Sequence, residues 1–315
     1  MLRVAKTLVF LALVPVVAGC AWLDRLKGER KDIDTTQTGD IQTTTAPELV
    51  RYLNRQAEHL KVVRYTDVSI DVRAGEKNFT LGDSFLICAK PRNLLLSGGK
   101  LVANDLVNLG SNDREFWMFT KFPEATYLYC SHSDFQQGHG QLPFPFDTDW
   151  ALQALGMATY DPKVEYRVET DYKNKEHHLT SDGVTPQGTP FRKVVVFSAF
   201  EASGNRPQVK RHLILDPSGK TIAMAEVKEV TTVAVGLDPQ TRQQVYASVP
   251  TRVALNWPQQ QFRMEMKMRP PKVNERLTEA EMTKLFTKPR MGDVEPMNLA
   301  EAKNLPSARG ATPRR

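Results

Sequence analysis

The feature that most constrains the fold is a repeated alternation of apolar and polar side chains between residues 66 and 268. In the clearest example the order is Phe262, Arg263, Met264, Glu265, Met266, Lys267, Met268. Successive side chains of a β-strand point to opposite faces of a sheet, so such a segment presents one face to a core and one to water. Similar segments, at 66–72, 79–87, 115–119, 191–200, 209–215, 221–235 and 252–257, predict an antiparallel sheet.

Helical patterns are few and short. Thr45 and Glu48 have the spacing of a capping box, and the apolar residues that follow recur at helical spacing as far as Leu60. A second short helix is predicted at 150–155, with Asp147 as its cap, and a third at 279–286. The sequence contains neither an internal repeat nor a second linker, so one domain over residues 45–287 is the simplest prediction.

The ends of the chain have a different character. Residues 20–44 are rich in polar residues and predict a flexible tether with a reach on the order of 25–30 Å. Residues 288–315 contain four prolines and end in Arg314 and Arg315, which predicts a disordered basic tail.

The first residues are typical of an export signal. Arg3 and Lys6 precede an apolar run over residues 8–18, whose 11 residues are too few to span a bilayer, which takes about 20. The run ends in Val-Ala-Gly followed by Cys20, which resembles the bacterial lipobox. That resemblance implies a signal peptide over residues 1–19 and lipid attached to Cys20. The alternative is an ordinary signal peptide with a coincidental cysteine.

Two properties of the predicted anchor concern its location. Several acyl chains on one residue anchor a protein stably, whereas a single chain binds a membrane only marginally. Ala21, rather than Asp, follows the cysteine, and by the sorting rule of enteric lipoproteins this favours the outer membrane, facing the periplasm. The expected membrane partner is therefore the bacterial cell envelope, reached through Cys20.

Charge and motifs argue against other classes of function. With 42 Lys and Arg against 36 Asp and Glu, the net charge of +6 is too small for a dedicated nucleic-acid binder. Gly82-Asp83-Ser84 is similar to one esterase motif, but the partner motif, an Asp three residues before a His, is missing. The histidines lack metal-ligand spacing, and surface histidines are the better interpretation. The sequence therefore predicts neither an enzyme nor a metal or cofactor site.

Four segments carry a resemblance to a known family: 109–118, with its turn and tryptophan strand, 215–222, 250–258 and 272–274. Together with the lipobox they resemble the LolA/LolB-like superfamily of outer-membrane lipoprotein carriers and receptors. The resemblance spans about residues 45–287. It implies an α+β fold in which an antiparallel, incomplete β-barrel wraps over a few helices, with a concave apolar face that holds acyl chains. LolA-type carriers are soluble, so the predicted lipid anchor matches the LolB-type receptor instead.

The candidate ligand-binding residues are apolar side chains on predicted strands: Trp117, Phe119, Phe197, Phe262, Met264, Met266 and Met268. Thioether side chains adapt to irregular apolar ligands, which favours the methionine row as a ligand-binding face. The alternative is that these side chains pack on the protein core, because an apolar face with a period of two is usually core.

With Cys20 lipidated, Cys88 and Cys130 remain as a candidate disulfide pair, because an exported compartment permits oxidation. The alternative is two buried thiols.

Two hypotheses for function follow. The first is a lipidated outer-membrane protein that binds an acyl chain or a lipoprotein in an apolar concave cavity and takes part in lipid or lipoprotein sorting. The second is a periplasm-facing protein-interaction or envelope-sensing module on the same fold, without a lipid ligand. An unfilled apolar cavity favours the first hypothesis, and a filled concave face favours the second.

Overall fold

The computed structural model describes residues 43–99, 106–121, 124–139, 148–200 and 206–301. The helices are α2 (Ala46–Glu58), α3 (His132–Gln136), α4 (Thr148–Ala154) and α5 (Glu279–Leu285). The strands are β1 (Val62–Ala74), β2 (Lys77–Ala89), β3 (Asn93–Gly98), β4 (Val107–Ser111), β5 (Glu115–Thr120), β6 (Thr126–Ser131), β7 (Arg167–Asp171), β8 (Glu176–Val184), β9 (Pro190–Ser198), β10 (Val209–Leu215), β11 (Thr221–Leu237), β12 (Gln244–Trp257), β13 (Phe262–Met268), β14 (Lys272–Val273) and β15 (Met297–Asn298).

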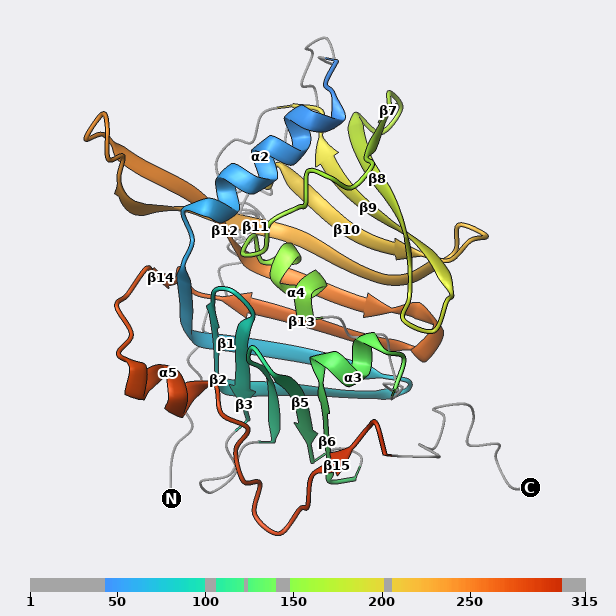
Figure 1. Ribbon diagram of the computed structural model, residues 1–315, viewed down its shortest axis with the longest axis vertical. Helices are drawn as coiled ribbons and strands as arrows, with labels where there is room; N and C mark the ends of the chain where they lie inside the picture. The colour runs from blue at the N-terminus through green and yellow to red at the C-terminus, as the bar shows by residue number, and fades with distance from the viewer. Residues whose placement is uncertain (1–42, 100–105, 122–123, 140–147, 201–205, 302–315) are drawn as a thin grey trace, which may run out of the picture. The chain divides into compact units, whose positions relative to one another are not determined.

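The strands form one 15-stranded sheet (Figure 1). Its order is β15-β6-β5-β4-β3-β2-β1-β13-β12-β11-β10-β9-β8-β7, and β14 pairs with β1 beside this path. Among the described strands, every pairing is antiparallel except that of β15 with β6. Within the described ranges the two end strands, β15 and β7, do not pair with each other, so the sheet is open. The predicted antiparallel, unclosed sheet with few helices is confirmed.

Helix α2 begins where its sequence signal places it. Thr45 is the N-cap, and the backbone nitrogen of Thr45 donates to the Glu48 carboxylate at 2.8 Å, which completes the capping box. The helix ends at Glu58, within two residues of the predicted end at Leu60. Figure 1 shows α2 and α4 in front of the sheet, on one of its faces, which we call the helix-covered face.

Helix α4 fills the middle of the helix-covered face. Trp150 and Leu152 are buried in one cluster with Met264, Met266 and Met268 of β13. The rings of Trp150 and Trp257 meet edge to face with 6.2 Å between their centroids. The apolar row of β13 is therefore part of a packed core, and its opposite face carries Arg263, Glu265 and Lys267 as the alternation predicts.

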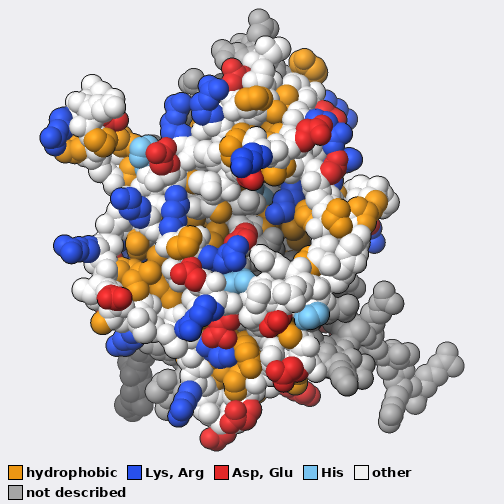
Figure 2. Space-filling model, viewed as in Figure 1, with side chains coloured by type: hydrophobic (Ala, Val, Ile, Leu, Met, Phe, Trp, Pro, Cys, Tyr) orange, Lys and Arg blue, Asp and Glu red, His pale blue; other side chains and the backbone are white. Residues whose placement is uncertain are grey.

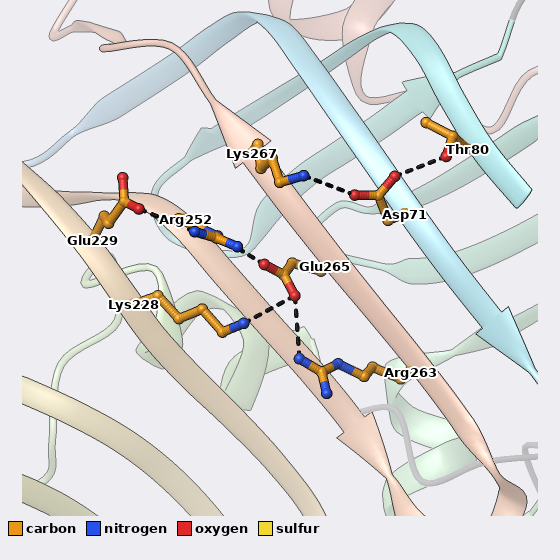
Figure 3. Close-up of polar contacts among 8 residues, drawn as sticks. All are labelled: Asp71, Thr80, Lys228, Glu229, Arg252, Arg263, Glu265 and Lys267. Carbon is orange, nitrogen blue, oxygen red and sulfur yellow. Dashed lines mark hydrogen bonds and ion pairs between the residues drawn. The ribbon is translucent and has the colours of Figure 1, made fainter. Parts of the chain in front are cut away.

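That opposite face of β13 carries a network of charged side chains (Figure 3). Lys228 Nζ donates to Glu265 Oε2 at 2.9 Å, and Arg252 Nε donates to Glu265 Oε1 at 2.7 Å. Partial burial raises the pKa of Glu265, but the hydrogen bonds from Lys228 and Arg252 outweigh burial and bring the pKa to about 2. Strands β11, β12 and β13 are thus joined by ion pairs on one face and by apolar packing on the other.

The structure corrects the predicted disordered tail over its first half. Residues 288–301 are part of the fold: β15 pairs with β6, and Leu299 is buried. The hydroxyl of Tyr127 donates to the carbonyl oxygen of Pro289 at 2.5 Å. The prediction of disorder rested on the prolines and was wrong for these residues. An extended segment that pairs at a sheet edge needs no helical or alternating pattern of its own, so the sequence carried no sign of its order. Residues 302–315 lie outside the described ranges.

Candidate functional site

A cavity of about 310 Å³, which we call the inner cavity, lies on the helix-covered face over β8, β9 and β10. Its walls come from these strands, from α4 and from residues 159–166, which connect α4 to β7. Its aromatic and aliphatic lining includes Trp150, Tyr160, Tyr166, Leu179, Phe191 and Val195. The volume is at the lower end of the range of about 300–1,000 Å³ for small-molecule sites, which suits one flexible apolar chain.

Helix α2 holds the connecting segment 159–166 in place. Asn54 Nδ2 donates to the carbonyl oxygen of Tyr160 at 2.9 Å, and the backbone nitrogen of Tyr160 donates to Asn54 Oδ1 at 2.7 Å. Both halves of one amide side chain are therefore used to join two elements that lie far apart in the sequence. Apolar packing between α2, this segment and strands β8 and β9 reinforces the contact through Leu49, Val50, Leu53, Tyr160, Leu179, Val195 and Phe197.

A buried histidine contributes to the wall of the inner cavity. His212 of β10 is 3% exposed, and its Nδ1 lies 3.2 Å from the hydroxyl of Tyr160. Burial, with a smaller contribution from the charge of Lys193, lowers the pKa of His212 to about 4. The imidazole is therefore neutral at pH 7, and this wall keeps a low polarity.

Two charged groups among the lining residues of the inner cavity, Asp182 and Lys193, contact other side chains of the fold. Arg192 Nε donates to Asp182 Oδ1 at 3.0 Å, and Arg167 pairs with the other oxygen of the same carboxylate. The hydrogen bond from Arg192 is the largest cause that holds the pKa of Asp182 below its usual value. Lys193 Nζ lies 5.8 Å from the centroid of the Phe191 ring, within the range of a cation–π contact.

A second cavity, of about 410 Å³, lies between α2 and the connecting segment, and we call it the outer groove. Its lining consists of Ala46, Pro47, Val50, Arg51, Asn54, Pro162, Val164 and Tyr166. A third, smaller pocket of about 60 Å³ lies between α2, α4 and the neighbouring strands. The space-filling view shows basic and hydrophobic side chains next to each other over α2 (Figure 2).

The seven predicted ligand-binding residues lie apart from these cavities, and the structure divides them among three clusters. Phe262, Met264, Met266 and Met268 belong to the core under α4, and Phe197 belongs to the cluster under α2. Trp117 and Phe119 lie on the other face of the sheet, packed against α5 and the segment after it. None of the seven lines any of the three cavities. Their burial favours the alternative interpretation, packing on the core.

Trp117 shows how the cluster beside α5 is filled by the protein's own side chains. Its indole Nε1 donates to Asn108 Oδ1 at 2.8 Å, and a Cβ added at Gly110 would lie 2.1 Å from the indole ring. The glycine thus leaves the space that the tryptophan fills. Phe286 and its neighbours then cover the ring.

The sequence patterns do not distinguish the residues that line the inner cavity. Trp150 lies on a predicted helix and His212 on a predicted strand, but neither pattern distinguishes a cavity wall from core. One signal was available: residues 194–197, Val-Val-Val-Phe, are apolar at every position, which indicates a strand covered on both faces. These four residues are indeed buried.

The candidate disulfide between Cys88 and Cys130 is not formed. Both thiols are free, and both are buried. Cys88 packs in the core under α4, whereas Cys130 packs with Phe116, Leu128 and Leu299. Strand β6 lies four positions from β2 in the sheet order, about 19 Å at the usual strand spacing. Disulfides join Cα atoms no more than about 7 Å apart. Burial raises the pKa of Cys88 to about 12.

The described residues contain neither a metal-binding cluster nor a membrane-spanning helix. Within those ranges, no group of three or more His, Cys, Asp or Glu side chains has the arrangement of a metal site. In the same part of the chain, no helix has the length and hydropathy needed to cross a membrane. Cys20 and the predicted signal peptide and tether lie outside the described residues.

Comparison with known proteins gave matches to solved structures only. No protein-family model matches the sequence, and no curated protein matches it. A putative outer membrane lipoprotein-sorting protein domain from Vibrio parahaemolyticus is 10% identical, with 75% of this chain and 95% of that chain covered and a TM-score of 0.48. A DUF1329 family protein from Desulfovibrio piger is 11% identical, with 76% and 97% covered and a TM-score of 0.47.

A third similar structure is a LolA superfamily protein from Nitrosomonas europaea, 12% identical, with 78% of this chain and 99% of that chain covered and a TM-score of 0.43. Two of these three proteins are described as a lipoprotein-sorting domain and a LolA superfamily protein, the family that the sequence resembles. At such identities and TM-scores the likenesses do not indicate what this chain binds.

Proposed function

We propose that this chain is a lipid-anchored protein of the bacterial cell envelope that binds an acyl chain, of a lipid or of a lipoprotein, in the inner cavity. The observation that carries the proposal is an unfilled space of about 310 Å³ whose walls are mainly aromatic and aliphatic. Each buried CH₂ contributes about 0.8 kcal/mol, so eight of them would contribute roughly 6 kcal/mol before the cost of immobilising the chain. Such binding needs no catalytic group.

The proposed anchor is lipid on Cys20 at the outer membrane, with the folded part facing the periplasm. A tether over residues 20–44 would let the mouth of the cavity approach a membrane or a second lipoprotein without contact between the fold and the headgroups. Transfer of a lipoprotein would then consist of moving its acyl chain between two apolar sites. This role in sorting is an extension of the binding proposal.

Native mass spectrometry on residues 21–315, purified without detergent, tests the binding proposal. All described helices and strands lie within residues 43–301, and the strands share one sheet, so this fragment contains the whole described fold. We expect co-purifying or added fatty acid to bind the unaltered protein, and Val195→Phe to reduce binding at least tenfold, because the new ring would occupy the inner cavity. Met266→Leu is the matched control in the filled core. The reverse pattern would place the ligand on the methionine row instead.

The filled core under α4 favours the alternative, a protein-interaction or envelope-sensing module without a lipid ligand. Met264, Met266 and Met268 are covered by the protein's own side chains, so this half of the face has no room for an acyl chain. A mass equal to that of the polypeptide alone, with no uptake of added fatty acid, would reject the lipid-binding proposal and support this module.

A further inference from the structure

We infer that the ligand is an amphiphile with an anionic headgroup, whose headgroup occupies the outer groove beside Arg51 while its acyl chain occupies the inner cavity. The inference rests on the proposed function, because it assigns the second half of the same ligand. It starts from the position of the outer groove, which has α2 on one side and the segment 162–166 on the other.

The outer groove and the inner cavity share a thin wall. Val164 and Tyr166 are the two described residues that line both. Val164 is 39% exposed, so its side chain is not locked in a core and can turn away at small cost. The neighbouring turn is anchored separately, because the backbone nitrogen of Lys163 donates to Asp161 Oδ1 at 2.8 Å. An acyl chain can therefore pass from the groove into the cavity while the main chain stays in place.

The charge in the outer groove is positive. Arg51 is the one Lys, Arg, Asp or Glu among its described lining residues. No described acidic side chain lies within ion-pair distance of Arg51. The nearest acidic neighbour on the helix is Glu48, whose carboxylate accepts hydrogen bonds from the backbone nitrogen and hydroxyl of Thr45. These hydrogen bonds are the main cause that lowers the pKa of Glu48, and the charge of Arg51 adds only a small contribution. The guanidinium is thus available to a phosphate or carboxylate, the groups that its planar donor set fits best.

The apolar remainder of the groove favours an amphiphile over a small soluble anion. Pro47, Val50, Pro162 and Val164 present carbon surface beside the guanidinium, and a hydrated inorganic ion would gain nothing from them. A glycerol phosphate headgroup would place its charge at Arg51 and its carbon atoms against these side chains.

Binding of two lysolipids with the same acyl chain tests the inference. We expect lysophosphatidylglycerol, which is anionic, to bind residues 21–315 about fivefold more tightly than zwitterionic lysophosphatidylcholine at low salt. Arg51→Gln should remove this preference, because it should weaken lysophosphatidylglycerol binding about fivefold and weaken lysophosphatidylcholine binding less, since choline offsets the charge of that lipid's phosphate. Arg55→Gln is the matched control, since Arg55 is on the same helix but lines none of the three cavities.

The other outcomes separate the two proposals. Equal affinity for both lysolipids, or a preference that survives Arg51→Gln, would overturn the headgroup assignment and leave acyl-chain binding intact. Binding of neither lysolipid would reject the proposed function and the inference together. Displacement of lysophosphatidylglycerol by an equal concentration of inorganic phosphate would show that the groove takes a free anion, which also overturns the inference.

Discussion

The two halves of the helix-covered face are built from the same materials but packed to different degrees. Over β1, β12 and β13, α4 and its tryptophan fill the space above the sheet, and the methionine row is buried. Over β8, β9 and β10, the irregular segment 159–166 covers part of the sheet beside α2 and α4 and leaves an unfilled space of about 310 Å³. A helix brings a continuous ridge of side chains to a sheet, whereas an irregular segment leaves gaps beside it. The nature of the covering element therefore decides where a ligand can enter.

The largest expected effect comes from removing a side chain in the filled half. Met266→Ala should lower the free energy of unfolding by about 3 kcal/mol, because the core cannot collapse fully onto the missing atoms. Urea unfolding followed by circular dichroism measures it. Met266→Leu, close to it in volume, should cost less than about 1.5 kcal/mol. If Met266→Ala kept its stability but lost acyl-chain binding, the methionine row would be the ligand-binding surface and the comparison of the two halves would be wrong.

The pH dependence of the free energy of unfolding should report on the half of the helix-covered face that contains the inner cavity. His212 has a pKa of about 4 in the fold and 6.5 as its ordinary value, so the unfolded chain binds an additional proton between these limits. Stability should therefore fall as the pH drops from 6.5 to 4, by up to about 3 kcal/mol. His212→Gln should flatten this part of the curve, while His178→Gln, on the partly exposed side of β8, should not.

A separate loss of stability at acid pH belongs to the charged face of β13, because Glu265 has a pKa of about 2 against its ordinary 4.5. Its contribution is present above pH 4.5 and is lost as the pH falls toward 2. Glu265→Gln should remove this loss without changing the slope above pH 5. A single transition insensitive to both substitutions would contradict the assignment of the two losses.

Enlarging one side chain in each half compares the packing directly. Val253→Phe, in the filled core, should cost about 1–3 kcal/mol of stability because no room exists for the ring. Val195→Phe should cost less, because the ring can enter the inner cavity, and it should block acyl-chain binding. Thermal unfolding and fatty-acid titration of both variants test this. Equal destabilisation would mean that the inner cavity is not accessible from β9.

The smallest effect on stability is expected on the charged face of β13. Lys267 Nζ lies 3.0 Å from Asp71 Oδ2, and both side chains are well exposed. Lys267→Ala should therefore change the free energy of unfolding by less than about 1 kcal/mol, and salt should reduce the difference further. Urea titrations at low and high salt measure it. A loss as large as that of Met266→Ala would contradict the assignment of the two faces of β13.

The sequence by itself determined the local structure. The capping box of Thr45 and Glu48 placed the start of α2, and the two-residue period placed β13 with its apolar and charged faces. These signals are local, because capping and alternation depend on side chains within a few residues of one another. They also supported a mostly antiparallel sheet, which the structure confirms.

Only the tertiary structure decided which apolar faces are filled. The methionine row of β13 and residues 194–197 of β9 are both apolar in sequence, and only the structure shows that α4 fills the space over the first while a cavity remains beside the second. The same holds for residues 288–301, which are ordered by pairing with β6, and for Cys88 and Cys130, which the sheet order separates. Burial of a strand face is a property of two elements that meet in space, and no pattern within one of them records its partner.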